Sequence, residues 1–151
     1  MAGIEILHVI FDASGSFCEP GKKNMLNYLG NTAMNFAYLS WAKVQFVFHT
    51  WNEELCEVDS VEKIPTQGVT DTEILQQFLA DCKENEAVIL VTDGNFEKFN
   101  RMKLKKISDE LGERFAIVAA GFDAEIILLQ SLSKNFYFAE DMYTAFKILA
   151  G

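Results

Sequence analysis

The sequence predicts a doubly wound α/β fold: a mainly parallel central sheet, helices on both faces, and one short antiparallel edge strand. Short apolar runs rich in Ile, Val and Phe alternate with longer segments of helical periodicity. The runs are almost continuously apolar, which is typical of strands covered on both faces. No linker, repeat or low-complexity stretch interrupts the alternation, so we expect a single domain over residues 1–151.

The first half of the chain is expected to form two buried strands, a long helix and a short edge strand. Residues 4–11 (IEILHVIF) form the first strand, and a helix over about 21–41 follows Pro20, which is tolerated at a first helical position. Residues 44–51 (VQFVFHTW) form the second strand. The segment 54–59 (ELCEVD) turns back against it and gives the antiparallel edge.

The second half continues the same alternation of helices and strands. We expect helices at 73–81, about 97–112, about 124–133 and from Asp141, and strands at 87–91 (AVILV), 115–122 (FAIVAAGF) and 136–139 (FYFA). In such a sheet, ligands bind beyond the carboxyl ends of the central strands, where the strand order reverses. Two of these strands end in carboxylates, Asp12 and Asp93, so this edge is the place to look for a site.

Composition argues against several partners and compartments. The net charge of −9 and the sequence pI of about 4.7 oppose binding to a nucleic acid or to an anionic membrane surface. The apolar runs are far shorter than the ~18 residues of a membrane span, and no basic, apolar leader opens the sequence. The three cysteines are odd in number and widely spaced, which favours a reducing compartment. We therefore expect a cytoplasmic protein.

Three short stretches bring hard oxygen donors to the same predicted edge. They are DASGS (12–16) after the first strand, GVTD (68–71) before the helix at 73–81, and TDG (92–94) after the AVILV strand. Carboxylates that face each other at a sheet edge repel unless a positive charge lies between them. Carboxylate and hydroxyl oxygens are the ligands that a small cation such as Mg²⁺ prefers.

Each stretch also has a purely structural interpretation. Thr70 and Glu73 have the spacing of a capping box at a helix start. The serines around Gly15 are compatible with a plain turn, and Asp93 followed by glycine is a common turn dipeptide. The metal hypothesis depends on the combination of the three stretches.

The pattern D-x-S-x-S, a later G-x-T and a strand that ends in T-D-G resembles the metal-ion-dependent adhesion site of von Willebrand factor A domains. The order of elements along the whole chain also fits that family. The resemblance implies a bound Mg²⁺, with Mn²⁺ or Ca²⁺ as alternatives. The sequence departs from the family pattern at Phe17, where many members have Met. Thr72 lies close to Thr70 in the sequence, so the identity of the second-loop ligand stays open. The implied metal ligands are Asp12, Ser14, Ser16, Thr70 and Asp93.

The resemblance implies a binding function and no enzymatic activity. A cation held mainly by neutral hydroxyls keeps an open position that a Glu or Asp of a partner protein completes. Phe17 and Phe96, in the same loops, are the candidates for an apolar rim around that partner, although aromatic residues beside a strand end more often belong to the core. Intracellular members of the family often act beside ATPases of the AAA class, so such a system is the partner that the analogy favours.

Other functions remain alternatives from the residues alone. Asp12 and Glu97 would suit a Mg²⁺-dependent phosphohydrolase or phosphate-binding protein, although Ser14 stands where haloacid-dehalogenase-like enzymes have a second Asp. A serine hydrolase needs a general base, and the two histidines, His8 and His49, lie inside predicted strands. A third alternative is a structural domain that binds metal without a partner.

Overall fold

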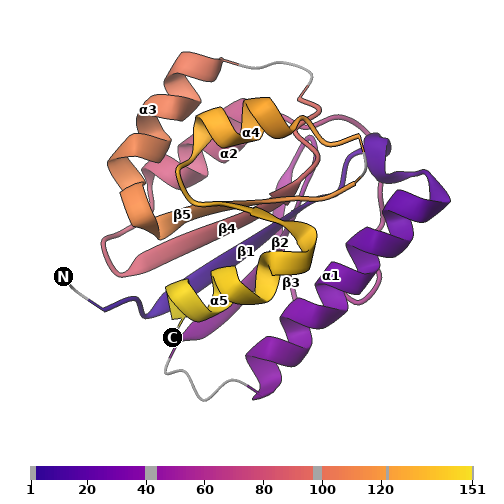
Figure 1. The fold of residues 1–151 in the computed structure, drawn as a ribbon, viewed down its shortest axis with the longest axis horizontal. Coiled ribbons are helices and arrows are strands. Elements are labelled where there is room, and N and C mark those ends of the chain that lie inside the picture. The colour runs from indigo at the N-terminus through magenta and orange to yellow at the C-terminus, as the bar shows by residue number, and fades with distance from the viewer. Residues whose placement is uncertain (1–2, 40–43, 97–99, 122, 151) are drawn as a thin grey trace.

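The computed structural model of the protein describes residues 3–39, 44–96, 100–121 and 123–150. Within these ranges six strands form one sheet in the order β3-β2-β1-β4-β5-β6 (Figure 1). Strand β3 pairs antiparallel with β2 at one edge, and the other pairs are parallel. The predicted fold class is therefore confirmed. The strands are β1 (Ile6–Asp12), β2 (Gln45–Trp51), β3 (Leu55–Val58), β4 (Glu86–Thr92), β5 (Phe115–Ala119) and β6 (Phe136–Phe138).

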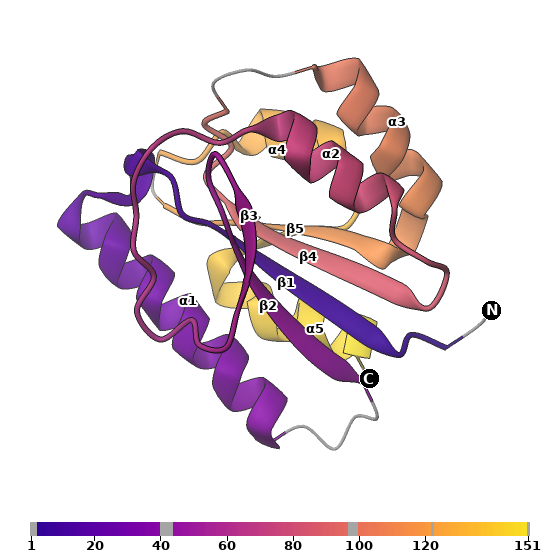
Figure 2. The same cartoon turned by 180° about the vertical axis from the view of Figure 1, so that it is seen from behind.

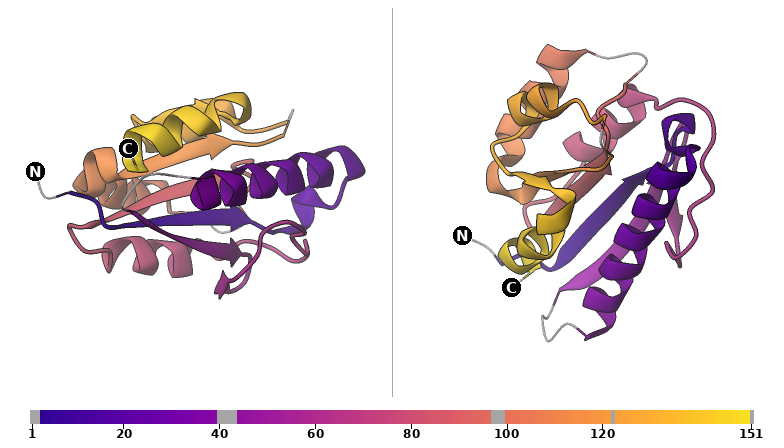
Figure 3. Two further views of the ribbon diagram at one scale, coloured as in Figure 1. Left: turned by 90° about the horizontal axis from the view of Figure 1, so that it is seen from below. Right: turned by 45° about the vertical axis from the view of Figure 1, so that its right-hand side comes forward.

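Helices cover both faces of the sheet (Figures 2 and 3). The residues of β1 alternate between two apolar clusters: Leu7 and Val9 face the cluster that contains α1 and α5, whereas Ile10 faces the cluster that contains α2, α3 and α4. The sheet is thus the middle of three layers. The helices are α1 (Pro20–Leu39), α2 (Thr72–Ala80), α3 (Arg101–Leu111), α4 (Ile126–Leu132) and α5 (Met142–Ala150).

Most element boundaries differ from the predictions by one or two residues. Helix α1 begins at Pro20, where proline loses no helical hydrogen bond. Strand β5 ends at Ala119, three residues before the predicted end. Helix α3 begins at Arg101, where the Asn100 side chain caps it by accepting a hydrogen bond from the Lys103 amide at 3.1 Å. The predicted positions 97–99 lie outside the described residues.

The long connection between β3 and α2 runs along α1 and is attached to it (Figure 2). The Ile64 amide donates to Asn27 Oδ1 at 3.0 Å, and the Val61 amide donates to Met34 Sδ at 3.2 Å. A Cβ on Gly30 would lie 1.9 Å from the Val61 carbonyl oxygen, so only glycine permits this close approach. Helix α1 therefore holds the connection in place.

The strand order reverses between β1 and β4. From β1 the chain proceeds outward to β2, and from β4 it proceeds in the opposite direction to β5. In parallel sheets this reversal opens a crevice beyond the carboxyl ends of the two strands. Asp12 closes β1, and Asp93 directly follows β4, so both lie at the crevice. No helix among the described residues is long and apolar enough to cross a membrane.

Candidate functional site

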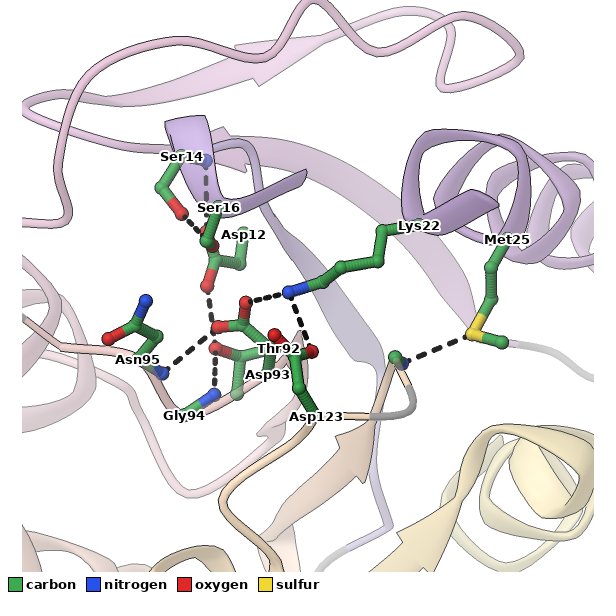
Figure 4. A network of polar contacts seen from close by, with 11 residues as sticks. Asp12, Ser14, Ser16, Lys22, Met25, Thr92, Asp93, Gly94, Asn95 and Asp123 are labelled. Atoms are coloured by element: carbon green, nitrogen blue, oxygen red, sulfur yellow. Dashed lines mark hydrogen bonds and ion pairs between the residues drawn. The ribbon is translucent and has the colours of Figure 1, made fainter. Parts of the chain in front are cut away.

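Asp12 lies at the centre of the carboxyl edge and is fully buried (Figure 4). Its Oδ1 accepts a hydrogen bond from the Ser14 amide at 2.9 Å, and its Oδ2 accepts one from Thr92 Oγ1 at 2.7 Å. Burial raises the pKa of Asp12 to about 6, and repulsion from Asp93 adds to this, while the hydrogen bonds from Ser14 and Thr92 favour the charged form. An Asp12 carboxylate is therefore costly here without a nearby positive charge.

The two serines of the first loop point toward one another. Their hydroxyl oxygens, Ser14 Oγ and Ser16 Oγ, are 2.9 Å apart. Two neighbouring ligands of an octahedral Mg²⁺, each about 2.1 Å from the metal, are separated by about 3 Å. The pair thus has the spacing that two adjacent metal ligands require. Here it forms a hydrogen bond between the two hydroxyls.

The second loop is tied to the first by backbone hydrogen bonds. The Gly15 amide donates to the Gly68 carbonyl at 2.7 Å, and the Gln67 amide donates to the Ala13 carbonyl at 2.9 Å. Gly68 has a φ of 73°, in the left-handed region that favours glycine. The chain that leads to Thr70 is thereby joined to the edge that carries the serines.

Thr70 does not cap α2, so the capping-box interpretation is wrong. The Asp71 side chain is the cap: its Oδ1 accepts hydrogen bonds from the Glu73 amide at 2.9 Å and the Ile74 amide at 3.4 Å. Because the Asp71 carboxylate, one residue closer to the helix, accepts from these amides, the Thr70 hydroxyl does not bind them. Thr70 is 2% exposed, and its Oγ1 has no hydrogen-bond partner among the residues that the structure describes.

An unsatisfied buried hydroxyl is uncommon and calls for an explanation, such as an ion or a water molecule. Thr72, the other threonine considered for this loop, is also buried but is the first residue of α2. The unpartnered oxygen therefore favours Thr70 as the donor from the second loop.

Asp93, the predicted donor of the third stretch, is paired with a lysine. Its Oδ1 accepts from the Asn95 amide at 2.9 Å, and its Oδ2 accepts from Lys22 Nζ at 2.8 Å. Lys22 Nζ is also 2.8 Å from Asp123 Oδ1 (Figure 4). Burial opposes a charged lysine, but the bonds to Asp123 and Asp93 raise the pKa of Lys22 above its usual value. The hydrogen bond from Lys22 also lowers the pKa of Asp123.

Sequence reasoning missed Lys22 and Asp123. Lys22 occupies the first turn of α1 in line with Leu26, Leu29 and Ala33, the buried stripe of that helix. A lysine at the helical spacing of an apolar stripe was the available signal. Asp123 follows β5 and is exposed, and the sequence offers no comparable signal for it.

The predicted apolar rim is not formed as expected. Phe17 is fully buried in the cluster that contains α1, so its prediction as a rim residue is wrong. Its ring lies 5.0 Å from Lys22 Nζ and so forms part of the wall around the lysine. Phe96 is half-buried, with its ring 5.6 Å from that of Trp51. Glu97, required by the phosphohydrolase alternative, lies outside the described residues.

The donor set fits a hard divalent cation held mainly by hydroxyls. Among the described residues, no three His, Cys, Asp or Glu side chains come together as metal ligands would. The edge offers instead two serine hydroxyls at the spacing of adjacent ligands, and the loop joined to it carries the Thr70 hydroxyl, which has no partner in the described part of the chain. The buried carboxyl groups of Asp12 and Asp93 supply the negative charge that such a cation requires. Such a set suits Mg²⁺ or Mn²⁺ better than Zn²⁺, which prefers nitrogen and sulfur ligands.

Comparisons with known proteins identify the fold. No protein-family model and no curated protein sequence matches the chain. Among solved structures, a von Willebrand factor type A protein from Catenulispora acidiphila matches 99% of this chain with a TM-score of 0.68 and 18% identity. The chain spans 43% of that protein.

Two further solved structures agree with this match. The manganese-loaded TRAP protein of Plasmodium vivax matches 97% of this chain, which spans 74% of it, with a TM-score of 0.65 and 15% identity. The ArnB paralog VWA2 of Sulfolobus acidocaldarius matches 95% of this chain, which spans 44% of it, with a TM-score of 0.59 and 14% identity. The chain therefore has the fold of von Willebrand factor A domains.

Proposed function

We propose that this chain is a protein-binding module that uses a divalent cation, Mg²⁺ in the first place, to capture a Glu or Asp side chain of a partner protein. The observation that carries the proposal is the buried Thr70 hydroxyl, which has no partner among the described residues and belongs to a loop joined to the Ser14–Ser16 turn. Support also comes from the solved TRAP structure with the same fold, which is described as manganese-loaded.

The residues divide into two groups by their role. Ser14, Ser16 and Thr70 would hold the cation through neutral oxygens, whereas Asp12 and Asp93 would balance its charge from behind. Because neutral ligands leave most of the positive charge in place, the bound cation would supply an electrophilic position that attracts a carboxylate. Asp12 also orients the first loop through its hydrogen bond to the Ser14 amide.

We infer that the module is not an enzyme. The imidazoles that a serine hydrolase would need are engaged elsewhere: His8 Nδ1 and His49 Nε2 are 2.9 Å from each other, and both rings contact Phe78 of α2. Ser14 also stands where the haloacid-dehalogenase-like enzymes considered above have a second Asp. We expect no Mg²⁺-dependent hydrolysis of a generic phosphomonoester. A rate well above background that Asp12→Asn abolishes would overturn this inference.

The partner and the location follow from the same analogy. We propose a partner that presents an acidic residue within an AAA-class ATPase system, and a cytoplasmic location. The acidic charge of the chain supports a metal-bridged contact, because two acidic surfaces attract each other only through a cation between them.

A binding experiment with matched variants tests the proposal. Wild type, Thr70→Val and Thr32→Val are immobilised and exposed to native extract in Mg²⁺, and bound protein is eluted with EDTA. Thr32 makes a control of the same chemistry, since its hydroxyl bonds the Tyr28 carbonyl on α1, away from the edge. We expect an EDTA-eluted protein from wild type and Thr32→Val and none from Thr70→Val. Retention that EDTA does not reverse, or that Thr70→Val leaves unchanged, would contradict the proposal.

A further inference from the structure

The carboxyl edge contains a buried positive charge of its own. Asp12 and Asp93 are 0% and 1% exposed, and Lys22 is 6% exposed as a whole residue. Lysines are almost never buried unless they are paired. The ammonium binds Asp93 and the exposed Asp123, so within the buried part of the edge two carboxylates are accompanied by one positive charge.

The lysine is held between two segments that are distant in the sequence. Its Nζ binds Asp93, which follows β4, and Asp123, which follows β5. The backbone at Gly121 passes close to its stem, because a Cβ there would lie 3.0 Å from Lys22 Cε. Gly121 has a φ of 100°, which also favours glycine. The ammonium is therefore a link between the edge and the segment that begins at Gly121.

Lys22 and a divalent cation would compete for the same negative charge. A 2+ ion beside Ser14 and Ser16 would by itself balance the two buried carboxylates, Asp12 and Asp93, and the added charge of Lys22 would then be offset only by Asp123, which is exposed and screened by solvent. Like charges in a water-poor site repel strongly. Asp93 already accepts from Lys22 at Oδ2 and from the Asn95 amide at Oδ1, so a divalent cation drawn toward this carboxylate would have to share one of these oxygens with a donor already bound.

We propose that the Lys22 ammonium and a divalent cation are alternative counter-ions of the Asp12–Asp93 edge, so that metal binding displaces Lys22 from Asp93. The proposal rests on the proposed metal site and adds the residue that sets its affinity. Lys22 raises the metal concentration needed to load the site. Its displacement also releases the contact with Asp93 through which it links Asp123 to the edge.

The first test compares the metal affinity of two lysine variants of the full chain. Lys22→Met keeps most of the aliphatic stem beside Phe17 and removes the charge. Lys23→Met is the matched control, because Lys23 is the adjacent residue, is exposed, and loses the same charge. Binding of Mn²⁺ alone is measured by calorimetry and by electron paramagnetic resonance. We expect Lys22→Met to bind at least about tenfold more tightly than wild type, and Lys23→Met to stay within about twofold.

The outcomes separate this proposal from the proposed function. Binding by Lys22→Met but not by wild type supports the competition and shows that the lysine has taken over the role of the metal, which contradicts the proposed function. Equal or weaker binding by Lys22→Met, beside a wild type that binds, overturns the competition and leaves the proposed function standing. No binding by either protein overturns both.

A second measurement needs no variant and decides the matter if Lys22→Met does not fold. The Lys22 ammonium of the wild-type protein is observed by nitrogen-15 NMR during titration with Mg²⁺. A buried, carboxylate-bound ammonium exchanges slowly enough to be distinguished from surface lysines. We expect its resonance to shift or to disappear as the site is loaded. An unchanged Lys22 resonance at saturating Mg²⁺ would overturn the proposal.

Discussion

The protein buries two groups of titratable side chains, and it stabilises them in opposite ways. The first, the carboxyl-edge cluster, consists of two acids, Asp12 and Asp93, and one base, Lys22, which is paired with Asp93. The second, the histidine pair, consists of His8 and His49, which share a hydrogen bond of 2.9 Å beneath Phe78. Burial and, to a smaller extent, the charge of His8 lower the pKa of His49 to about 4, and burial also lowers the pKa of His8, so the pair remains neutral at pH 7.

The difference shows which buried polar group points to a ligand. The histidine pair is neutral and partly satisfied: one imidazole donates a hydrogen bond to the other and the Phe78 ring covers both, while His8 Nε2 has no hydrogen-bond partner among the described residues and lies 3.5 Å from Glu86 Oε2. The carboxyl-edge cluster contains a buried lysine bound to Asp93, and on the loop joined to the Ser14–Ser16 turn the Thr70 hydroxyl has no partner among the described residues. Unbalanced charge together with an unsatisfied donor is a stronger sign of a binding site than burial alone.

The largest effect is expected when the internal counter-ion of the edge is removed. In EDTA, Lys22→Met leaves Asp93 buried and unpaired, which should lower the free energy of unfolding by about 3 kcal/mol. The double variant Lys22→Met/Asp93→Asn should recover most of that loss. Urea unfolding measures both, with Lys23→Met as the control, which should change by less than about 0.5 kcal/mol. A wild-type stability for Lys22→Met would mean that the carboxyl-edge cluster, like the histidine pair, needs no internal counter-ion.

The next effect concerns pH and the histidine pair. The pKa of His49 is about 4 in the folded protein against 6.5 ordinarily, so its stabilising contribution is present above pH 6.5 and is lost as the pH falls toward 4. The loss amounts to up to about 3 kcal/mol. His49→Gln should show a flatter stability profile over this range.

Asp12 changes the profile in the opposite direction, because a raised carboxyl pKa favours the folded state as the pH falls toward 4. The contribution of Asp12 is the same in wild type and in His49→Gln, so it cancels in the difference between their stability profiles. Urea unfolding in EDTA at several pH values gives that difference. Parallel profiles for wild type and His49→Gln would show that His49 does not titrate in this range.

A smaller effect is expected from the metal. If the dissociation constant for Mg²⁺ is about 1 mM, then about 10 mM Mg²⁺ stabilises the fold by about 1.4 kcal/mol, a rise in Tm of about 3 to 6 °C. Asp12→Asn should abolish the rise and be as stable as wild type in EDTA, or slightly more so, because a repelling carboxylate is gone. Thermal melts in EDTA and in Mg²⁺ test this. A flat wild-type response up to about 30 mM would argue against a metal site.

The smallest effect distinguishes the two neighbours at the start of α2. In EDTA, Thr70→Val should stabilise the protein by up to about 1 kcal/mol, because it removes a buried hydroxyl without a partner. Asp71→Ala should destabilise it by about 1 kcal/mol, because two helix amides lose their acceptor. Urea unfolding measures both. A loss of stability in Thr70→Val would mean that its hydroxyl has a partner after all.

The fold could be predicted because local patterns specify it. The apolar runs of β1, β4 and β5 are each nearly continuous, and buried strands are read from such runs directly. The same pattern placed Asp12 and Asp93 at one edge, as the pairing of β1 with β4 and the hydrogen bond between Thr92 and Asp12 confirm. Their role as metal ligands remains a prediction.

The remaining features depend on contacts that a local pattern does not encode. Lys22 and Asp93 are separated by 71 residues in the sequence, and their pairing requires the packing of α1 on the sheet. Thr70 and Asp71 are both acceptable capping residues by type, and the backbone conformation decides between them. Phe17 lies beside a strand end, where aromatic residues serve either a core or a surface, and packing decided for the core.

The attachment of the β3–α2 connection to α1 has a mechanical consequence. Helix α1 carries Lys22 in its first turn. Further along, its residues Asn27, Gly30 and Met34 contact the connection that leads to Thr70. Helix α1 therefore positions both the Lys22 ammonium and the connection that leads to the Thr70 hydroxyl, which has no partner in the described part of the chain. An axial displacement of α1 would move these two groups together. It could start at the carboxyl edge or at the exposed end of the helix near Tyr38. The helix would thus couple its outer surface to the crevice in both directions.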